Sequence, residues 1–172
     1  IADELEKYNF HATFFVVGSL AERYPELILR EISEGHEIAS HTWSHPHLAK
    51  LPEATLENEL SATEEFLYEL AEYRPKLFRP PEGKCPDSVR RVAAELDYEV
   101  VLWTVDTRDW AHTPTETIVK TVLDNTEPGA IILCHDFIGG NSPTPDALRK
   151  FIPELKRNGY EFVTVSDLIY TD

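Results

Sequence analysis

Apolar residues along this chain alternate between short continuous runs and longer stretches with helical spacing. Residues 12–17 form a nearly continuous apolar run, which is typical of a strand buried on both faces. Further along, a mostly leucine series recurs three or four positions apart and predicts the buried face of a long helix. Its members are Leu56, Leu60, Thr63, Leu67 and Leu70. The two patterns follow one another along the chain, which predicts alternating strands and helices.

Six strands are predicted, at residues 12–17, 35–40, 77–79, 99–104, 130–133 and 160–164. Helices are predicted at residues 1–9, 25–34, 56–70, 87–96, 113–124, 145–158 and 166–170. The helix after residue 112 begins with Thr113-Pro114-Thr115-Glu116, which has the form of a capping box. Because strands alternate with helices, we expect an α/β fold with a parallel sheet, open or closed into a barrel. No repeat or linker interrupts the 172 residues, so residues 1–172 are expected to form a single domain.

Composition narrows the range of partners. The chain has 16 basic and 31 acidic residues, a net charge of −15, which argues against binding to nucleic acid or to an anionic membrane. No apolar run approaches the roughly 20 residues that a membrane-spanning helix needs, and the acidic start of the chain has no signal-peptide pattern. Cys85 and Cys134 fit neither a metal spacing nor a disulfide framework, so two buried thiols are expected.

His41-Thr42-Trp43-Ser44-His45 is the most informative short motif. Two histidines four residues apart share a face on a helix, or on a tight loop wound like one. Neutral imidazoles suit Zn²⁺, and a catalytic zinc site takes three protein ligands and leaves a position for water. The alternative is that one or both histidines cap a helix or fill a polar pocket.

Further polar residues stand where predicted strands end. They are His41 and His45 after the second strand, Arg79 at the end of the third, Asp106 and Asp109 after the fourth, and His135 after the fifth. The carboxyl ends of parallel strands are where chemistry gathers in α/β folds. We therefore expect these side chains to belong to one site.

Each of these residues has an ordinary interpretation beside the functional one. Arg79 precedes two prolines on a rigid turn and either binds a carboxylate in bidentate fashion or forms a structural ion pair. Asp106 and Asp109 can orient a histidine, ligate a metal or cap the next turn. Trp110 either forms a wall of a sugar site or packs in the core.

His135 lies at the mouth of a predicted buried strand, where it acts as a general acid or base or is simply a capped structural histidine. A histidine pair for a metal, an Arg–Asp network and a separate histidine suit one reaction class. A divalent metal polarises a carbonyl and activates water, while a histidine protonates the leaving amine. The combination predicts metal-assisted hydrolysis of an amide or ester.

Five motifs, in order, resemble those of the polysaccharide deacetylase family, also called the NodB-homology domain or carbohydrate esterase family 4. They lie at residues 13–18, 41–45, 78–83, 105–110 and 132–136. The resemblance implies a distorted barrel of βα units that removes N- or O-acetyl groups from an acetylated polysaccharide or oligosaccharide, such as chitin or peptidoglycan. It also implies secretion or attachment to the cell envelope, and Zn²⁺ or another divalent ion such as Co²⁺ as cofactor.

The same resemblance implies roles for individual residues. His41 and His45 would be metal ligands, and His135 the general acid. Arg79 would orient the catalytic acid–base network, which Asp106 or Asp109 would tune.

Substrate contacts are implied as well. Trp110 and Leu133 would line the acetyl pocket, and Pro81 and Glu82 would belong to the substrate groove. Many family members carry an aromatic residue where Glu82 stands, which implies a different substrate subset, nearer to the peptidoglycan branch.

The family's first motif is a strand ending in Thr-Phe-Asp-Asp-Gly-Pro, which supplies the catalytic base and the third metal ligand. These 172 residues contain no such segment, so the barrel is expected to lack its first strand and to self-associate through open sheet edges. Asp106, Asp109 or Asp136 would then be candidates for a substitute ligand. Three alternatives stay open: a deacetylase without its first strand, a catalytically impaired glycan-binding relative, and a binding protein without a metal.

Overall fold

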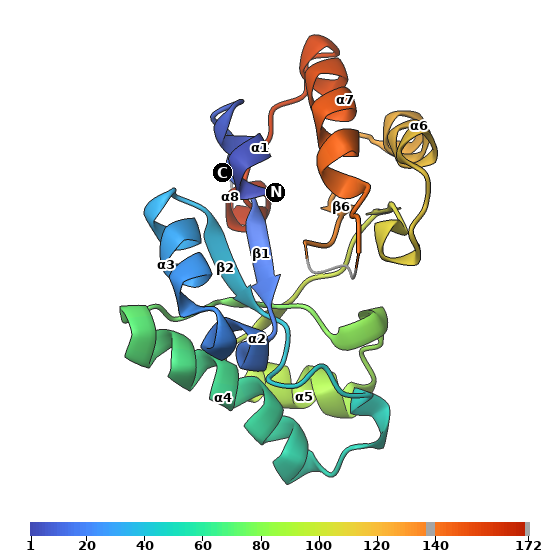
Figure 1. The fold of residues 1–172 in the computed structure, drawn as a ribbon. Helices are drawn as coiled ribbons and strands as arrows, with labels where there is room; N and C mark the ends of the chain where they lie inside the picture. The colour runs from blue at the N-terminus through green and yellow to red at the C-terminus, as the bar shows by residue number, and fades with distance from the viewer. Residues whose placement is uncertain (137–139, 171–172) are drawn as a thin grey trace. The chain divides into compact units, whose positions relative to one another are not determined.

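The structure is a computed structural model that describes residues 1–136 and 140–170 (Figure 1). Two compact units are present: a central unit, Thr13–Leu102, and a terminal unit, which combines Ile1–Ala12 with Trp103–Asp172. Each unit holds its own parallel sheet, and helices alternate with the strands. The predicted α/β class with parallel strands is therefore confirmed.

The central unit is built on a four-stranded parallel sheet whose strand order follows the sequence. Its strands are β1 (Thr13–Val16), β2 (Glu37–Ser40), β3 (Leu77–Phe78) and β4 (Glu99–Val100). Its helices are α2 (Gly18–Arg23), α3 (Pro25–Ser33), α4 (Glu53–Ala71) and α5 (Asp87–Glu95), with short 3₁₀ turns η1 (Leu48–Lys50) and η2 (Pro81–Gly83).

The core of the central unit follows the predicted apolar spacing. Helix α4 buries Leu56, Leu60, Thr63 and Leu67, as its periodicity predicts. Leu60 packs with Phe78 and Val89, whereas Leu67 packs with Ile28 and Ile38. Strand β1 is half-buried along its length, not buried on both faces as expected, because it forms the edge of this sheet.

The terminal unit contains helix α1 (Ala2–Glu6) and the part of the chain after Leu102. Its two strands, β5 and β6, pair in parallel, with Asp106 opposite Leu133. Helix α6 packs along α7, and α1 also contacts α7. The remaining elements are β5 (Val105–Asp106), η3 (Asp109–Ala111), α6 (Thr115–Asn125), β6 (Ile132–Leu133), α7 (Thr144–Arg157) and α8 (Val165–Tyr170).

The strand predicted at residues 99–104 is confirmed only at its start, Glu99–Val100. The chain there forms β4 in the central unit and β5 in the terminal unit, separated by a short segment without strand structure. Val101 still donates its N–H to the Phe78 carbonyl, whereas the N–H groups of Thr104 and Val105 turn to the Ile131 carbonyl. The apolar run is continuous, but its hydrogen-bond partners belong to two different sheets.

The strand predicted at residues 160–164 is wrong. This segment belongs to neither of the described sheets. Its side chains hold it instead: the Tyr160 hydroxyl donates to the Thr126 carbonyl at 2.8 Å, and the Phe162 ring stacks on Phe10 with centroids 4.6 Å apart. The capping box expected at Thr113 does not form, because the Thr113 hydroxyl donates to the Arg108 carbonyl.

No helix in residues 1–136 and 140–170 is both long and apolar enough to span a bilayer.

Ion pairs between a buried carboxylate and two half-exposed cations join the two segments of the terminal unit. The Glu4 carboxylate accepts two hydrogen bonds from the Arg149 guanidinium, at 2.6 and 2.9 Å, and Lys7 Nζ lies 2.9 Å from each of its oxygens. These bonds, that from Arg149 foremost, lower the pKa of Glu4 from 4.5 to about 2. Because α1 is only five residues long, this contact with α7 fixes its position more than its own hydrogen bonds do.

Replacing Glu4 by Gln tests this contact through the pH dependence of stability. The pKa of Glu4 is lower in the folded state, so ionised Glu4 stabilises the fold above about pH 4.5, and this contribution is lost as pH falls towards 2. Urea unfolding at several pH values should therefore show Glu4→Gln less stable than wild type near pH 7, with the gap closing in acid. Glu6→Gln, an exposed neighbour on α1, is the control. An equal loss of stability for both variants at pH 7 would contradict this account.

Candidate active site

His41 and His45 stand close together on a tight loop, not on a helix. The loop directly follows β2, and Thr42 and His45 adopt left-handed backbone conformations, with φ of 69° and 57°. The two imidazole rings have centroids 4.9 Å apart and planes inclined at 71°. Of the two geometries expected from the spacing, the tight loop is the one that forms.

The junction between β1 and α2 holds the first half of this loop. His41 donates its N–H to the Val16 carbonyl at 2.9 Å, and Gly18 donates its N–H to the Thr42 carbonyl at 2.9 Å. A Cβ added at Gly18 would lie 2.7 Å from Thr63 Oγ1 and closer still to the Trp43 ring. Only glycine therefore lets the Trp43 ring lie against the start of α2.

Glu59 of α4 holds the second half of the loop. Its backbone carbonyl accepts the Trp43 N–H at 2.8 Å, and its carboxylate accepts the Ser44 N–H at 2.8 Å and the Ser44 hydroxyl at 2.7 Å. These three bonds fall on the residues between the two histidines. The spacing of the imidazole rings is thus set by the scaffold on both sides.

Arg79 touches the loop through its backbone. Its carbonyl oxygen lies 2.5 Å from Nδ1 of His41, so this nitrogen carries the proton in the neutral ring and Nε2 carries the lone pair. The guanidinium is buried 3.7 Å above the Phe15 ring, and burial lowers the pKa of Arg79 to about 10. The expected orienting role of this guanidinium stays a prediction, since Arg79 lies in the central unit and Asp106 and Asp109 in the terminal one.

Pro81 and Glu82 line a surface cavity of about 200 Å³ in the central unit. Glu82 has a left-handed backbone, and its carboxylate contacts Lys84 Nζ at 2.7 Å and His47 Nδ1 at 3.2 Å. The hydrogen bond from Lys84 is the main cause of a lowered pKa of Glu82. The other lining residues are His47, Leu48, Ala49, Lys50 and Lys84. A cavity of this kind is compatible with the predicted substrate role, which stays a prediction.

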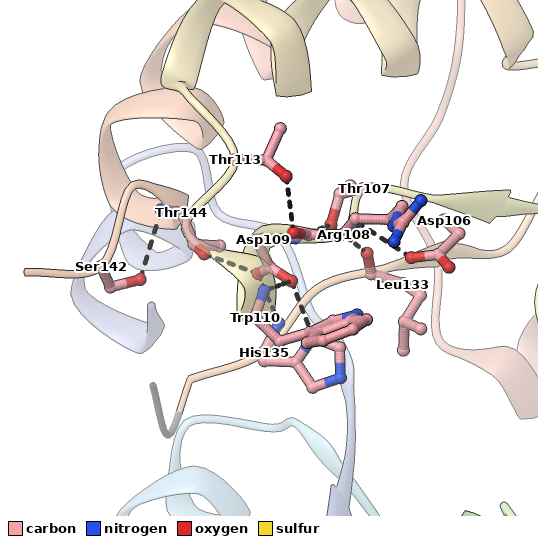
Figure 2. Close-up of polar contacts among 10 residues, drawn as sticks. All are labelled: Asp106, Thr107, Arg108, Asp109, Trp110, Thr113, Leu133, His135, Ser142 and Thr144. Carbon is pink, nitrogen blue, oxygen red and sulfur yellow. Dashed lines mark hydrogen bonds and ion pairs between the residues drawn. The ribbon is translucent and has the colours of Figure 1, made fainter. Parts of the chain in front are cut away.

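Asp109 is the hub of the polar residues in the terminal unit (Figure 2). Its side chain is fully buried and accepts four hydrogen bonds. Oδ1 accepts from Nδ1 of His135 at 2.7 Å and from the Trp110 N–H at 2.9 Å. Oδ2 accepts from the His135 N–H at 2.7 Å and from the Thr144 hydroxyl at 2.6 Å. With both oxygens engaged in this way, Asp109 is a poor substitute metal ligand.

The protonation states of this pair follow from the hydrogen bonds. Burial alone would raise the pKa of Asp109, but the bonds from His135 and Thr144 outweigh it and hold the pKa below its usual value. Asp109 is therefore ionised at neutral pH. It accepts from Nδ1 of His135, so in the neutral ring Nε2 has the lone pair, as a general acid–base requires.

The structure places the other predicted residues of this unit as follows. Asp106 accepts the Arg108 N–H at 2.9 Å, which is the turn-capping alternative among the three left open. Trp110 is 53% exposed, so the core-packing alternative for it is wrong. Leu133 is buried in β6, and its carbonyl accepts the Thr107 hydroxyl at 2.7 Å. Their roles towards a substrate stay predictions.

Four residues that position this chemistry were missed from the sequence: Gly18, Glu59, Thr107 and Thr144. Thr107 lies inside a recognised motif, so its position between two aspartates was a usable signal. Thr144 precedes a proline at a helix start, a pattern that indicates only a helix boundary. Glu59 is one of many acids on α4, and nothing in the sequence distinguishes it from the others.

Comparison with known proteins agrees with this arrangement. The profile of the polysaccharide deacetylase family matches residues 1–101, more than half of the chain. A peptidoglycan-N-acetylglucosamine deacetylase of Bacillus cereus is 43% identical over 172 residues. The chain belongs to the polysaccharide deacetylase family.

The similarity extends over nearly the whole of this polysaccharide deacetylase chain. The alignment with the B. cereus enzyme covers 99% of the chain and 62% of that protein. The peptidoglycan-N-acetylmuramic acid deacetylase PdaC of Bacillus subtilis is 39% identical over 98% of the chain and 35% of its own length. The chain thus spans between about a third and two thirds of these two relatives.

Solved structures place the fold in the same family. The Bc1960 peptidoglycan N-acetylglucosamine deacetylase has a TM-score of 0.94 at 42% identity, over 99% of this chain and 80% of that one. A family 4 acetyl xylan esterase from Clostridium thermocellum, in complex with cobalt, has a TM-score of 0.91 at 34% identity, over 98% and 81%. BA3943 of Bacillus anthracis, a pseudoenzyme of the family, has a TM-score of 0.90 at 27% identity, over 96% and 58%.

The His41–His45 loop of this family member fits a divalent transition metal in part. Two imidazoles side by side, one with Nδ1 held by a backbone carbonyl, are the donor type and outer contact that zinc and cobalt sites use. Within residues 1–136 and 140–170, no group of three or more His, Cys, Asp or Glu side chains is placed to hold a metal. The described residues therefore account for two of the three protein ligands of a typical catalytic zinc site.

Gly18→Ala tests the support of the histidine loop. The added methyl meets the Trp43 ring and Thr63, so we expect the free energy of unfolding to fall by about 1–3 kcal/mol, measured by urea denaturation. A double-mutant cycle with Trp43→Leu is the control, because a smaller side chain at position 43 relieves the clash. Equal costs of Gly18→Ala in both backgrounds would show that Trp43 is not the residue that requires glycine here.

Proposed function

We propose that this protein hydrolyses the N-acetyl groups of amino sugars in peptidoglycan, at the cell wall, and that residues 1–172 belong to one deacetylase domain. The observation that carries the proposal is the Asp109–His135 pair, a buried, ionised carboxylate bonded to a part-exposed imidazole. Two of the relatives named above, the B. cereus enzyme and PdaC of B. subtilis, are peptidoglycan deacetylases and support the substrate class. The acidic charge of the chain and its lack of a basic surface excess give no support for nucleic acid as a partner.

In this mechanism His135 is the general acid. Asp109 holds Nδ1–H, so the proton that moves is the one on Nε2. His135 begins as the imidazolium, with protons on both ring nitrogens. Water adds its oxygen to the acetyl carbonyl carbon, the C–N bond breaks, and His135 gives its Nε2 proton to the departing amine. The two protons of the water are released to solvent, from which His135 regains one. Acetate and a free amino sugar are the products. Asp109 stays ionised throughout and stabilises the imidazolium form.

His41 and His45 are the residues that would hold a divalent ion, Zn²⁺ or Co²⁺. When bound, such an ion supplies polarisation of the acetyl carbonyl and a lower pKa of water. The chain's own contribution is to fix the two rings: Arg79 sets the tautomer of His41, and Glu59 sets the loop between them. Substrate contacts are assigned to the exposed face of Trp110, to Leu133, and to the cavity at Pro81 and Glu82.

A second candidate function is glycan binding without efficient catalysis. The likeness to BA3943, a pseudoenzyme, favours it, because a deacetylase-like fold at this level of similarity need not be active. In that case the cavity at Glu82, in the central unit, would hold the sugar, and the Asp109–His135 pair of the terminal unit would be structural.

Metal binding is tested by calorimetric titration of the protein with Zn²⁺. We expect one ion per chain, and His41→Ala or His45→Ala should weaken its affinity by about two orders of magnitude or more, because each removes a direct ligand. His11→Ala, an exposed histidine of the terminal unit, is the control and should leave the affinity unchanged. Affinity that is indifferent to all three substitutions would rule out the His41–His45 loop as the metal site.

Substrate class is tested by acetate release from peptidoglycan oligosaccharides and from acetylated xylan, both with Zn²⁺ present. Hydrolysis of the N-acetyl substrate at a higher kcat/KM supports the proposal. Preferential hydrolysis of xylan esters would contradict the substrate class while keeping the reaction type. Binding of the oligosaccharide with no acetate release would favour the glycan-binding alternative.

A further inference from the structure

Thr144 connects helix α7 to the acid–base pair. It is the first residue of α7 and is fully buried, although its side chain is polar. Its hydroxyl donates to Asp109 Oδ2 at 2.6 Å, across 35 positions of sequence. Its own N–H donates to the Ser142 hydroxyl at 3.3 Å (Figure 2). A buried hydroxyl with a charged acceptor forms one of the stronger hydrogen bonds available in a protein.

The four donors to Asp109 are not equivalent. Three come from His135 itself or from the backbone of Trp110, the next residue in the sequence. These three donors therefore belong to the Asp109–His135 pair or to its direct neighbour. Thr144 is the fourth, and it belongs to a separate helix that packs on α6. Without its hydroxyl, Oδ2 would keep one donor, so the carboxylate would be held only by His135 and its own neighbour and its rotation would be less constrained.

Other groups near Asp109 cannot take over this role. Cys134 is near enough for the Asp109 charge to act on it, but burial foremost raises the pKa of its thiol to about 12, so it is neutral and only a weak donor. The Thr107 hydroxyl donates to the Leu133 carbonyl and accepts the Asp109 N–H, so it holds the backbone of Asp109 and not its carboxylate. Asp106 is acidic and bonded to the Arg108 N–H.

We propose that Thr144 is a positioning residue of the deacetylation reaction: its hydroxyl fixes the Asp109 carboxylate so that Oδ1 faces Nδ1 of His135, Nδ1 keeps its proton, and Nε2 is the nitrogen that takes up and gives up the reactive proton. The inference rests on the proposed function for its catalytic consequence. Its structural consequence, the tautomer of His135, does not depend on activity. A histidine held in the wrong tautomer presents N–H where a lone pair is needed.

The test compares Thr144→Val, which keeps the shape and removes the hydroxyl, with Thr144→Ser, which keeps the hydroxyl. ¹⁵N NMR of the His135 ring reports its tautomer above the pH where the ring is protonated. We expect wild type and Thr144→Ser to carry the proton on Nδ1, and Thr144→Val to show a mixture with Nε2–H. We also expect kcat to fall about tenfold in Thr144→Val, with KM within twofold and with recovery in Thr144→Ser.

Several outcomes would overturn the inference. One is a pure Nδ1–H tautomer in Thr144→Val; another is a Thr144→Ser variant as impaired as Thr144→Val, which would assign the effect to the methyl group. If Thr144→Val does not fold, Thr144→Ala removes the hydroxyl without a second methyl and is judged by the same criteria. If no variant, wild type included, releases acetate, the proposed function fails, while the NMR comparison still decides the positioning role.

Discussion

The structure of the terminal unit depends on burying one ionised carboxylate, that of Asp109. Such burial is unfavourable unless every oxygen lone pair finds a donor, and Asp109 has four. The donors come from η3, from His135, the second residue after β6, and from the start of α7. Satisfying this one charge therefore brings three segments to a single arrangement, and the same bonds that stabilise Asp109 also fix the tautomer of His135.

The central unit positions its histidine loop by a different set of contacts. The strands of its sheet are short, and β3 and β4 have two residues each. The backbone hydrogen bonds between strands therefore do little by themselves to position the histidine loop. The histidine loop is instead held by Val16 and Gly18 on one side and by Glu59 on the other. In both units the chemistry lies in segments that follow strands, which is where parallel α/β folds place their functional residues.

Much of this could be predicted from the sequence, and the errors have a common cause. Helix α4, the histidine pair and the strand-end position of His135 follow from local periodicity and spacing, which are properties of neighbouring residues. The strand predicted at 160–164 is wrong and that at 99–104 is confirmed only at its start, because ladder pairing depends on distant partners, which an apolar run does not specify. Thr144 and Glu59 were missed for the same reason: each acts on a residue far away in the chain.

Acetate release from peptidoglycan oligosaccharides, compared between wild type and His135→Asn in the presence of Zn²⁺, tests the central claim most directly. The asparagine amide fills the space of the part of the imidazole ring nearest the backbone, but it cannot act as a general acid. We therefore expect a loss of at least about 100-fold in kcat with the fold intact. Comparable acetate release by both proteins would contradict the assignment of the Asp109–His135 pair as the catalytic acid–base group.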